Sequence, residues 1–460
     1  MIHSTIVMPN WIADDLKTAT HEHDEKAAVL LAGLARTRSG LRLSVREVLW
    51  VPDHAYSRRT PRSLSILSEG YVPALTKAED TGMVPIWLHT HPGHNALGVR
   101  SEYDEIVDDE LSETFRVRSG ARVYASIVIS PGDNLMRFSG IVIDGDDVSS
   151  LQRMLVVGPR WSLIAAVDVP IEERIPTMFD RQVRAFGGDL QQVLSNLTVA
   201  IVGCGGTGSA VGEQLARLGV RSMLLVDPDE LSDSNVTRVY GSTPSKVGCP
   251  KVQVLGDHLK RIAPDAVIRT VRNKITEQKI ARQLTECDVV FGCTDDNAGR
   301  LVLSRLSSYY LTPVIDMGVL LSSSSGLLQG IDGRVTVLFP GEACLVCRGR
   351  VDLARAQAEQ LDSSERESLQ AEGYAPELGA IEPAVIPFTS IVASIAVAEL
   401  IERFVGYGPE PEPGEILARC HEREISTNSR APTPHHYCDP DAGQFATGDR
   451  APFLGQTWRS

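Results

Sequence analysis

The pattern of apolar and polar positions divides the chain into two regions of different character. Up to about residue 150, short apolar runs alternate with turns, which predicts strands at residues 29–35, 43–51, 84–89, 123–129 and 136–143, with the end of a helix at 18–26. From residue 196 a fully apolar strand at 197–202 is followed by a glycine loop, a helix at 209–218 that Gly219 ends, and a strand at 222–226. This order predicts one β-α-β unit of a doubly wound sheet.

These patterns predict an α/β fold class with four parts. We expect an N-terminal α/β domain with a mixed sheet over residues 1–155, a connector rich in Pro and Gly over 156–195, a doubly wound Rossmann-like domain over 196–430, and a loop-rich tail over 431–460 that docks on the second domain. Residues 384–401 are the most apolar late stretch. They include Pro387, Ser390 and Glu399, which favours a buried helix over a membrane span.

Composition narrows the class of protein. The chain has 460 residues, of which 43% are hydrophobic and 23% charged, which excludes a disordered, collagen-like or coiled-coil chain. Its formal net charge of −14 gives no overall attraction for nucleic acid or an anionic membrane, and we expect neither partner. Residues 1–15 lack a basic start followed by an apolar core, so we expect no secretory signal and a cytoplasmic location. Eight cysteines in such a chain favour metal binding or reactive thiols over disulfides.

Two histidines and a carboxylate form the first candidate site. The sequence His-Thr-His-Pro at residues 89–92 places His89 and His91 on the same side of a strand end, and Asp104 at the next helix start can complete a set of three ligands. Two imidazoles and one carboxylate leave one zinc position open for water, which is typical of catalytic zinc. Glu25, just before the apolar run at 27–32, is the candidate general base.

This pattern resembles the JAMM (JAB/MPN) metalloprotease family over about the first 150 residues. Family members combine a glutamate ahead of a strand that ends in glycine with His-x-His-Pro and a later Ser-x-x-Asp; here these are Glu25 with Gly33, residues 89–92, and Ser101 with Asp104. The resemblance implies zinc held by the two histidines and Asp104, with Glu25 as base and Ser101 holding the water or the oxyanion. The family cleaves peptide or isopeptide bonds after the C-terminus of ubiquitin-like proteins.

The spacing departs from that family at one point. Eight residues, 93–100, separate Pro92 from Ser101, where the family usually has six. The longer loop creates a rival ligand, His94. The longer loop also leaves a second interpretation, in which the site is inactive and the domain only docks the carrier protein.

A glycine-rich loop forms the second candidate site. It follows a strand and begins a helix, so its backbone can approach a phosphate that the free N–H groups of the helix then bind. Its glycines are Gly203, Gly205, Gly206 and Gly208. Asp227, at the end of the next strand, is placed to bind ribose hydroxyls. These residues alone leave a dinucleotide-dependent oxidoreductase open.

The residues that follow resemble the ubiquitin-activating and sulfur-carrier (ThiF-type) adenylyltransferase family over about residues 176–405. The motifs occur in the family's order at 226–238, 247–251, 293–300 and 316–318. The resemblance implies that the C-terminal carboxylate of a carrier protein attacks the α-phosphorus of ATP. Arg238 and Lys251 would neutralise the charge, Asn235 would contact phosphate or ribose, and Asp295 would bind magnesium, with Asp296 beside it as the alternative.

Two further features bear on this resemblance. Residues 179–182, Phe-Asp-Arg-Gln, resemble the motif whose arginine reaches the ATP of the partner subunit, which implies a homodimer with Arg181 acting in trans. No cysteine lies between residues 348 and 404, where ubiquitin-activating enzymes carry their thioester cysteine; Cys249 and Cys420 are weak candidates. An oxidoreductase would leave Arg238, Lys251 and Arg300 unexplained.

A pair of Cys-x-x-Cys-like motifs forms the third candidate site. Cys344 and Cys347 stand far upstream of the sequence His-His-Tyr-Cys at 435–438. Two pairs with the same spacing favour a closed tetrahedral zinc site, and relatives of the activating family often carry two such pairs here. We expect Cys344, Cys347, His435 and Cys438 to hold a structural zinc, with His436 as the rival; a redox pair or buried thiols are the alternatives.

The sequence thus favours a bifunctional enzyme of a prokaryotic ubiquitin-like pathway. It would adenylate the C-terminus of a ubiquitin-like protein with ATP and Mg²⁺, and hydrolyse bonds at that C-terminus with one catalytic zinc, beside one structural zinc. A conjugating enzyme is the further expected partner. The alternative is a sulfur-carrier adenylyltransferase for cofactor or cysteine biosynthesis, with a JAMM-like domain that trims or only docks the carrier.

Overall fold

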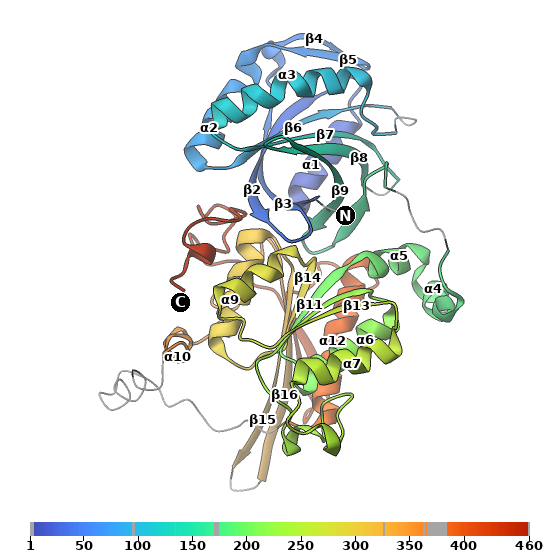
Figure 1. The fold of residues 1–460 in the computed structure, drawn as a ribbon, viewed down its shortest axis with the longest axis vertical. Coiled ribbons are helices and arrows are strands. Elements are labelled where there is room, and N and C mark those ends of the chain that lie inside the picture. The colour runs from blue at the N-terminus through green and yellow to red at the C-terminus, as the bar shows by residue number, and fades with distance from the viewer. Residues whose placement is uncertain are drawn as a thin grey trace. The chain divides into compact units, whose positions relative to one another are not determined.

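The computed structural model describes residues 4–458 apart from 94–96, 134, 170–173, 325–326, 362–364 and 366–383. Contacts divide the chain into two units, each built around its own sheet (Figure 1). Unit 1 contains Met1–Glu172 and two later segments, Tyr309–Leu311 and Gly443–Ala451. Unit 2 contains Glu173–Ser308, Thr312–Ala442 and Pro452–Ser460.

The sheet of unit 1 is mixed and closes on itself. Its strand order is β1-β3-β2-β6-β7-β8-β9-β10, and β1 also pairs with β9. The elements of this unit are β1 (Ser4–Pro9), α1 (Asn10–Thr20), β2 (Ala27–Arg36), β3 (Leu41–Trp50), β4 (Tyr56–Thr60), β5 (Ser63–Ile66), α2 (Val72–Thr81), β6 (Val84–Thr90), α3 (Glu102–Ser119), β7 (Val123–Pro131), β8 (Met136–Asp144), β9 (Asp147–Val157) and β10 (Ser162–Ala165). All five strands expected in this region are confirmed, as β2, β3, β6, β7 and β8. The helix ends at residue 20 rather than 26, and the boundary expected at residue 155 falls inside β9.

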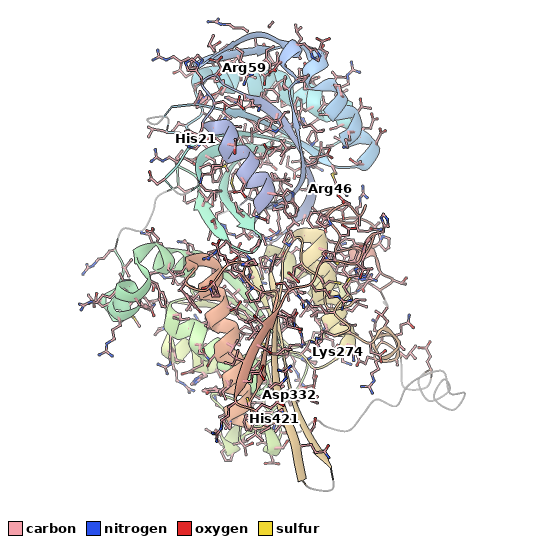
Figure 2. The ribbon with its side chains drawn as sticks, turned by 180° about the vertical axis from the view of Figure 1, so that it is seen from behind. His21, Arg46, Arg59, Lys274, Asp332 and His421 are labelled. Atoms are coloured by element: carbon pink, nitrogen blue, oxygen red, sulfur yellow. The ribbon has the colours of Figure 1, made fainter. Side chains whose placement is uncertain are left out.

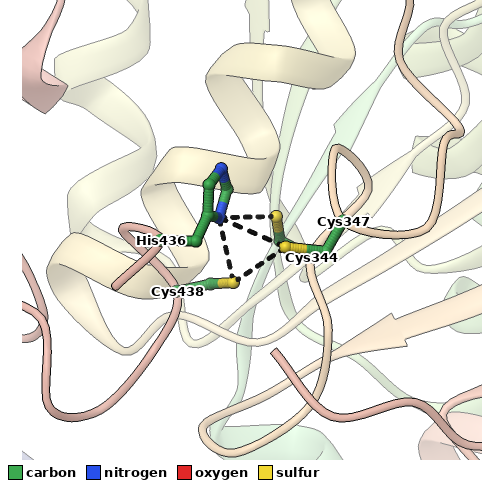
Figure 3. A group of neighbouring side chains, drawn as sticks. All are labelled: Cys344, Cys347, His436 and Cys438. Atoms are coloured by element: carbon green, nitrogen blue, oxygen red, sulfur yellow. Dashed lines mark hydrogen bonds between the residues drawn. The ribbon is translucent and has the colours of Figure 1, made fainter. Parts of the chain in front are cut away.

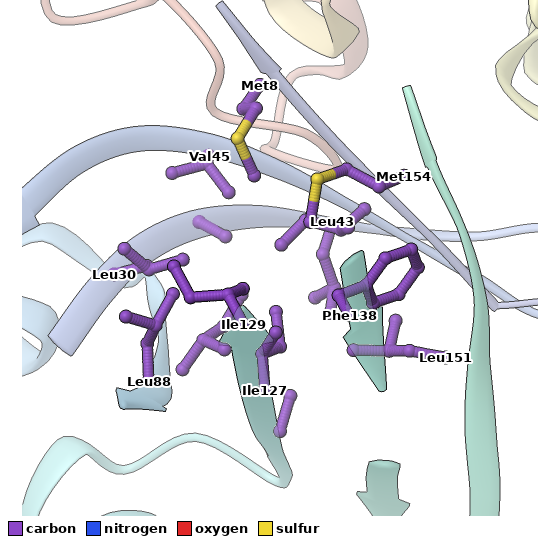
Figure 4. Close-up of a cluster of buried hydrophobic side chains, with 14 of the residues drawn as sticks. Met8, Leu30, Leu43, Val45, Leu88, Ile127, Ile129, Phe138, Leu151 and Met154 are labelled. Atoms are coloured by element: carbon purple, nitrogen blue, oxygen red, sulfur yellow. The ribbon is translucent and has the colours of Figure 1, made fainter. Parts of the chain in front are cut away.

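Strand β2 is apolar on both faces because two cores cover it. Ala28, Leu30 and Ala32 join the core inside the closed sheet, whose members include Met8, Leu43, Ile127, Phe138 and Met154 (Figure 4). The alternate residues Ala27, Val29 and Leu31 join a second core with residues of α2 and α3. Successive strand residues point to opposite faces, so only a continuous apolar run fits such a position.

The last residues of β2 are covered by residues 443–451, which lie far downstream in the sequence. The pairing of β2 with β6 ends at Ala32, and residue 34 bridges to residue 448 in its place. A Cβ atom on Gly33 would lie 2.3 Å from the backbone carbon of Thr447, so the segment can approach only where β2 carries glycine. Residues 443–451 therefore belong to unit 1, whereas the whole tail was expected on the second domain.

The sheet of unit 2 is parallel in its first half and antiparallel in its second. The order is β13-β12-β11-β14-β15-β16-β17-β18, with parallel pairs from β13 to β15. The elements are α4 (Asp180–Phe186), α5 (Gly188–Asn196), β11 (Thr198–Val202), α6 (Gly206–Leu218), β12 (Ser222–Val226), α7 (Lys251–Ile262), β13 (Val267–Val271), α8 (Gln278–Ala281), β14 (Val289–Gly292), α9 (Asn297–Tyr310), β15 (Val314–Ser324), β16 (Leu327–Leu338), α10 (Leu353–Ala358), α12 (Ile386–Val405), β17 (Glu415–Arg419) and β18 (Glu424–Asn428).

The doubly wound arrangement expected for this unit is confirmed. Helices α6, α7 and α12 lie on one side of the sheet and α9 on the other (Figure 1). Gly219 ends α6 in the left-handed conformation, with φ of 92°, as its position predicts. The apolar stretch at 384–401 forms α12, which packs against α6, β15 and β16. In the part of the chain that the structure covers, no helix combines the length and apolar character that crossing a bilayer requires.

Candidate functional sites

The first candidate site lies where β6 ends and α3 begins, in unit 1. Nε2 of His89 lies 3.2 Å from Nε2 of His91 and 3.1 Å from Oδ1 of Asp104, and His91 Nε2 lies 3.8 Å from Oδ2 of Asp104. One ligand atom from each residue falls within 4.8 Å of the others, so the three could hold one metal ion. The longer loop before Ser101 does not keep Asp104 from the histidines. The rival ligand His94 lies outside the described residues.

The start of α3 fixes the orientation of Asp104. Ser101 is the N-cap: its hydroxyl accepts a hydrogen bond from the backbone N–H of Asp104 and donates one to Oδ2 at 2.8 Å. The backbone N–H of Ser101 donates to the same oxygen at 2.6 Å. Although burial opposes ionisation, hydrogen bonds from His89 and Ser101 lower the pKa of Asp104. Ser101 is thus placed to orient the ligand Asp104, a role that its sequence assignment did not include.

The protonation of the site suits a metal ion. Burial lowers the pKa of His91 to about 4, so its imidazole is neutral near pH 7, which is the form that binds metals. Nδ1 of His89 is buried, and no group in the described part of the chain hydrogen-bonds to it. Imidazole nitrogens beside an anionic carboxylate oxygen are donors that zinc prefers.

Glu25 lies two residues before the strand position that pairs with His89. In the register of β2 and β6, Ala27 is opposite His89. The backbone of Glu25 is held by Arg59 of β4 (labelled in Figure 2), whose Nε donates to the Glu25 carbonyl at 2.9 Å, and by the carbonyl of Thr60. Burial raises the pKa of Glu25 to about 7. A carboxyl group with this pKa can accept and return a proton near neutral pH.

The second candidate site is a cavity of about 710 Å³ in unit 2. It lies at the carboxyl ends of the parallel strands β11, β12 and β14, where ligands of doubly wound sheets bind. Eight of the residues expected to bind the nucleotide or to act in catalysis line this cavity: Gly203, Gly205, Gly206, Asp227, Asn235, Arg238, Lys251 and Asp295. The wall also includes five charged residues that were not assigned: Asp229, Lys274 (labelled in Figure 2), Arg300, Arg355 and Glu359. Of these, Asp229 and Arg300 had a sequence signal, because they lie within the family motifs at 226–238 and 293–300.

The backbone around the glycine loop is fixed by the end of β12. Asp227 accepts hydrogen bonds from the backbone N–H of Cys204 at 2.6 Å and of Asp229 at 2.9 Å. Burial raises the pKa of Asp227, and Lys251 partly offsets that effect. Lys251 begins α7, and its Nζ lies 2.7 Å from Oδ2 of Asp229. The aspartate expected to bind ribose therefore also ties the loop to its strand.

Two glycines of the loop should respond differently to the same substitution. A Cβ atom on Gly208 would lie 1.8 Å from the backbone oxygen of Gly203, so we expect Gly208→Ala to destabilise unit 2 by about 1–3 kcal/mol or more. A Cβ atom on Gly205 meets no atom within 4 Å, so Gly205→Ala should fold and lose mainly ATP affinity. Thermal unfolding together with calorimetric titration of ATP checks both variants. Equal melting temperatures for the two would contradict the described loop geometry.

The two neighbouring aspartates have different surroundings. Oδ1 of Asp296 accepts the backbone N–H of Gly299, and the hydroxyl of Thr294 donates to Oδ2, so Asp296 is engaged at the start of α9. Among the hydrogen bonds and ion pairs of the described residues, none engages the carboxylate of Asp295, which lines the cavity. This difference favours Asp295 over Asp296 as the residue that would hold magnesium.

The third candidate site joins the two Cys-x-x-Cys-like motifs in unit 2, with one correction (Figure 3). His436, not His435, lies with the cysteines: its Nδ1 is 3.5 Å from Sγ of Cys344, 3.3 Å from Cys347 and 3.2 Å from Cys438. The backbone decides between the two histidines. His435 has a left-handed φ of 61°, and its N–H donates to the carboxylate of Asp439.

The spacing of these four ligand atoms fits a tetrahedral zinc ion. Bond lengths of about 2.3 Å to sulfur and 2.0–2.1 Å to nitrogen imply edges of roughly 3.8 Å between sulfurs and 3.5 Å between sulfur and nitrogen. The sulfurs of Cys347 and Cys438 are 3.7 Å apart, and the distances to His436 are 3.2–3.5 Å. A hydrogen bond from Cys438 lowers the pKa of Cys344, which favours the thiolate that binds metals. The donor set is therefore suited to a structural zinc.

Two residues expected at the nucleotide site lie elsewhere or have another role. Arg181, on α4, is exposed and is not among the residues that line the cavity. Gly208 supports the loop from inside α6 and does not line the cavity. The cysteines considered for a thioester differ in access, because Cys249 is exposed and Cys420 is half-buried.

Comparisons with known proteins bear on unit 2. A model of the ThiF family matches residues 179–439. The molybdopterin-synthase adenylyltransferase of Escherichia coli is 30% identical over 256 residues, which are 54% of this chain and 90% of that protein. The sulfur carrier protein ThiS adenylyltransferase of E. coli is 29% identical over 35% of this chain and 61% of that protein. The ubiquitin-like modifier-activating enzyme 5 of Gallus gallus is 26% identical over 47% of this chain and 52% of that protein.

Proposed function

Because this chain belongs to the ThiF family, we propose that unit 2 adenylates the C-terminal carboxylate of a ubiquitin-like or sulfur-carrier protein. The observation that carries the proposal is the convergence of glycine loop, Asp227, Arg238 and Lys251 on one cavity. The carboxylate attacks the α-phosphorus of ATP, an acyl-adenylate forms, and pyrophosphate leaves. Nucleophile and triphosphate are both anionic, so the cations Arg238 and Lys251 lower the barrier by neutralising charge.

Exchange of labelled pyrophosphate into ATP tests this activity. The reaction should depend on a carrier protein, and a panel of purified ubiquitin-like and sulfur-carrier proteins would supply one. Exchange with no member of the panel, in protein that binds ATP, would refute the proposed class of substrate. The product then separates the two pathways, because a sulfur carrier gains a thiocarboxylate, whereas a ubiquitin-like protein becomes attached to lysines.

The acyl group has no obvious acceptor in the described cavity. Cys293 is the cysteine of its wall, and burial raises the pKa of that thiol, which makes it a poor nucleophile. We therefore propose that the adenylate passes directly to a thiol of a conjugating partner or to another external nucleophile.

We also propose that unit 1 is a zinc-dependent hydrolase of bonds at the carrier C-terminus. The supporting observation is the cluster of His89, His91 and Asp104 beside a carboxyl group, Glu25, with a pKa near 7. A zinc ion held by the three ligands would supply an acidified water. Glu25 takes the proton of the nucleophile and returns it to the leaving amine, and Ser101 keeps Asp104 in place. Cleavage of a fusion between the carrier C-terminus and a peptide tests the activity; carrier binding without cleavage would make unit 1 a docking domain.

We propose further that the active form is a homodimer in which Arg181 completes the partner's site. Arg181→Ala and Lys251→Ala would each inactivate adenylation as pure homodimers. Mixed together and allowed to exchange subunits, they should regain roughly a quarter of the wild-type activity, because half of the dimers carry one intact site out of two. Activity measured on unmixed and mixed samples decides this. A mixture as inactive as its components would place Arg181 in its own subunit's site, whereas an active Arg181→Ala homodimer would place it outside the reaction.

A further inference from the structure

Arg300 lines the nucleotide cavity but has no part in the mechanism proposed above. It is the fourth residue of α9, and its side chain is 17% exposed. Its Nε lies 3.6 Å from Oδ1 of Asp316, a residue of β15 whose side chain is fully buried. Neither atom hydrogen-bonds to any group that the structure describes. The position of this cation at the cavity wall is therefore linked to that of Asp316.

Asp316 is itself held by a second arginine. Nη2 of Arg334, on β16, lies 2.6 Å from Oδ2 of Asp316. Two glycines leave the space that these charged groups occupy. A Cβ atom on Gly318 would lie 3.3 Å from Nη2 of Arg300, and one on Gly292 would lie 3.1 Å from Oδ1 of Asp316.

A row of polar residues continues from Asp316 across the sheet. Asp316 is opposite Thr336 on β16, Thr336 is opposite Glu415 on β17, and Glu415 is opposite Asn428 on β18. Directly opposed residues share one face of a sheet, so these four side chains are neighbours. The hydroxyl of Thr336 accepts a hydrogen bond from Arg334 and donates one to Oε1 of Glu415 at 3.0 Å. We call Asp316, Thr336, Glu415 and Asn428 the polar row.

The far end of the polar row meets the loop that follows Cys347. Arg350 donates from Nε and Nη2 to the two oxygens of Glu415, at 2.9 and 2.8 Å. Arg348 donates to Oδ1 of Asn428 at 2.7 Å and also pairs with buried Glu342. Burial alone would raise the pKa of Glu415, but hydrogen bonds from Arg350 and Asn428 lower it to about 2. The two arginines are one and three residues from a proposed zinc ligand.

We propose that the polar row positions Arg300 for nucleotide binding and makes ATP affinity depend on metal occupancy at Cys344, Cys347, His436 and Cys438. The inference rests on the proposed function of unit 2. A buried network of charges is stable only when each member keeps its hydrogen-bond and ion-pair partners. The loss of a partner at one end therefore changes the positions of the side chains along the whole row. When the loop after Cys347 loosens, Glu415 loses Arg350, Thr336 and Arg334 readjust, and Asp316 no longer fixes Arg300.

Removing the hydroxyl of Thr336 interrupts the hydrogen bonds of the polar row with the smallest change in side-chain packing. Thr336→Val keeps the shape of the side chain and removes both hydrogen bonds, whereas Thr336→Ser keeps the hydroxyl. Thr336 does not line the cavity, so a direct effect on ATP is excluded. In metal-loaded full-length protein we expect the Kd for ATP, measured by calorimetry, to rise about fivefold or more in the valine variant and to be unchanged in the serine variant. A valine variant with wild-type Kd would overturn the proposal.

Removing the metal tests the other half of the inference. Treatment with a chelator, which is removed before titration in buffer with Mg²⁺, should raise the Kd of wild-type protein for ATP by a similar factor. It should have little further effect on Thr336→Val, because the hydrogen bonds of the polar row are already lost. An equal relative loss in both proteins would show that metal acts independently of the row, and would overturn the inference. Circular dichroism identifies samples that have unfolded; if stripped protein unfolds, Asp316→Asn in metal-loaded protein must reproduce the rise in Kd. Wild-type protein that binds no ATP would instead refute the proposed function.

Discussion

Replacing Lys251 with alanine is expected to lower carrier-dependent pyrophosphate exchange by about 100- to 1,000-fold. Lys251 begins α7 at the cavity wall, and its side chain is only 13% exposed. In the transition state an anionic carboxylate approaches an anionic triphosphate. A cation fixed at that point stabilises the transition state without having to reorganise, and water cannot replace it fully. Initial rates of exchange at saturating ATP and carrier give the measurement.

The substitution should leave the fold intact. The partner of Lys251, Asp229, is 61% exposed, so solvent compensates its carboxylate when the lysine is gone. Lys279→Ala is a matched control, because Lys279 is 73% exposed, pairs with Glu277 and lies outside the cavity wall. Equal exchange rates for Lys251→Ala and Lys279→Ala would show that Lys251 takes no part in the reaction.

Two substitutions in unit 1 should separate metal binding from proton transfer. Glu25→Gln is expected to lower hydrolysis at the carrier C-terminus by about 100- to 10,000-fold and to leave zinc bound, because Glu25 is not one of the clustered ligands. His89→Ala, which removes a ligand, should lower the zinc content from two ions per chain to one. Elemental analysis of purified protein and cleavage of a carrier fusion measure the two effects.

The neighbouring residue supplies the control for Glu25. Asp24→Asn changes the charge by the same amount one position earlier, where the carboxylate pairs with the exposed His23. It should keep both the zinc and the activity. One zinc ion per chain in wild-type protein, unchanged by His89→Ala, would contradict the hydrolase and leave unit 1 as a docking domain.

Residues at strand ends could be predicted from the sequence because their chemistry is local. The glycine loop, Asp227 and Asp295 each follow an apolar strand, and parallel strands bring such positions to one edge of the sheet. His89 and His91 follow the same logic at the end of β6. The sequence pattern did not predict which strands pair with one another in the sheets.

The parts that were missed depend on contacts distant in sequence. β1 pairs with both β3 and β9 to close the sheet of unit 1, and β9 begins with polar residues that give no strand signal. The repeated spacing pointed to His435, three residues before Cys438, whereas the ligand set contains His436, two residues before it, and His435 has a left-handed φ of 61°. Asp316 and Glu415 lie about 100 residues apart and meet through Thr336, and this alignment follows from strand register alone.

The coverage of β2 by residues 443–451 makes the end of this strand depend on a segment that is synthesised after unit 2 has been started and largely completed. The N–H of Asp449 donates to the carbonyl of Leu34 at 2.7 Å, and the carboxylate of Asp449 accepts the N–H of Arg36. A premature stop at codon 443 would keep every ligand of both metal clusters, yet would leave the end of β2 with unpaired backbone groups. The end of β2 therefore gains these partners only when a segment 413 residues downstream of Arg36 has been synthesised.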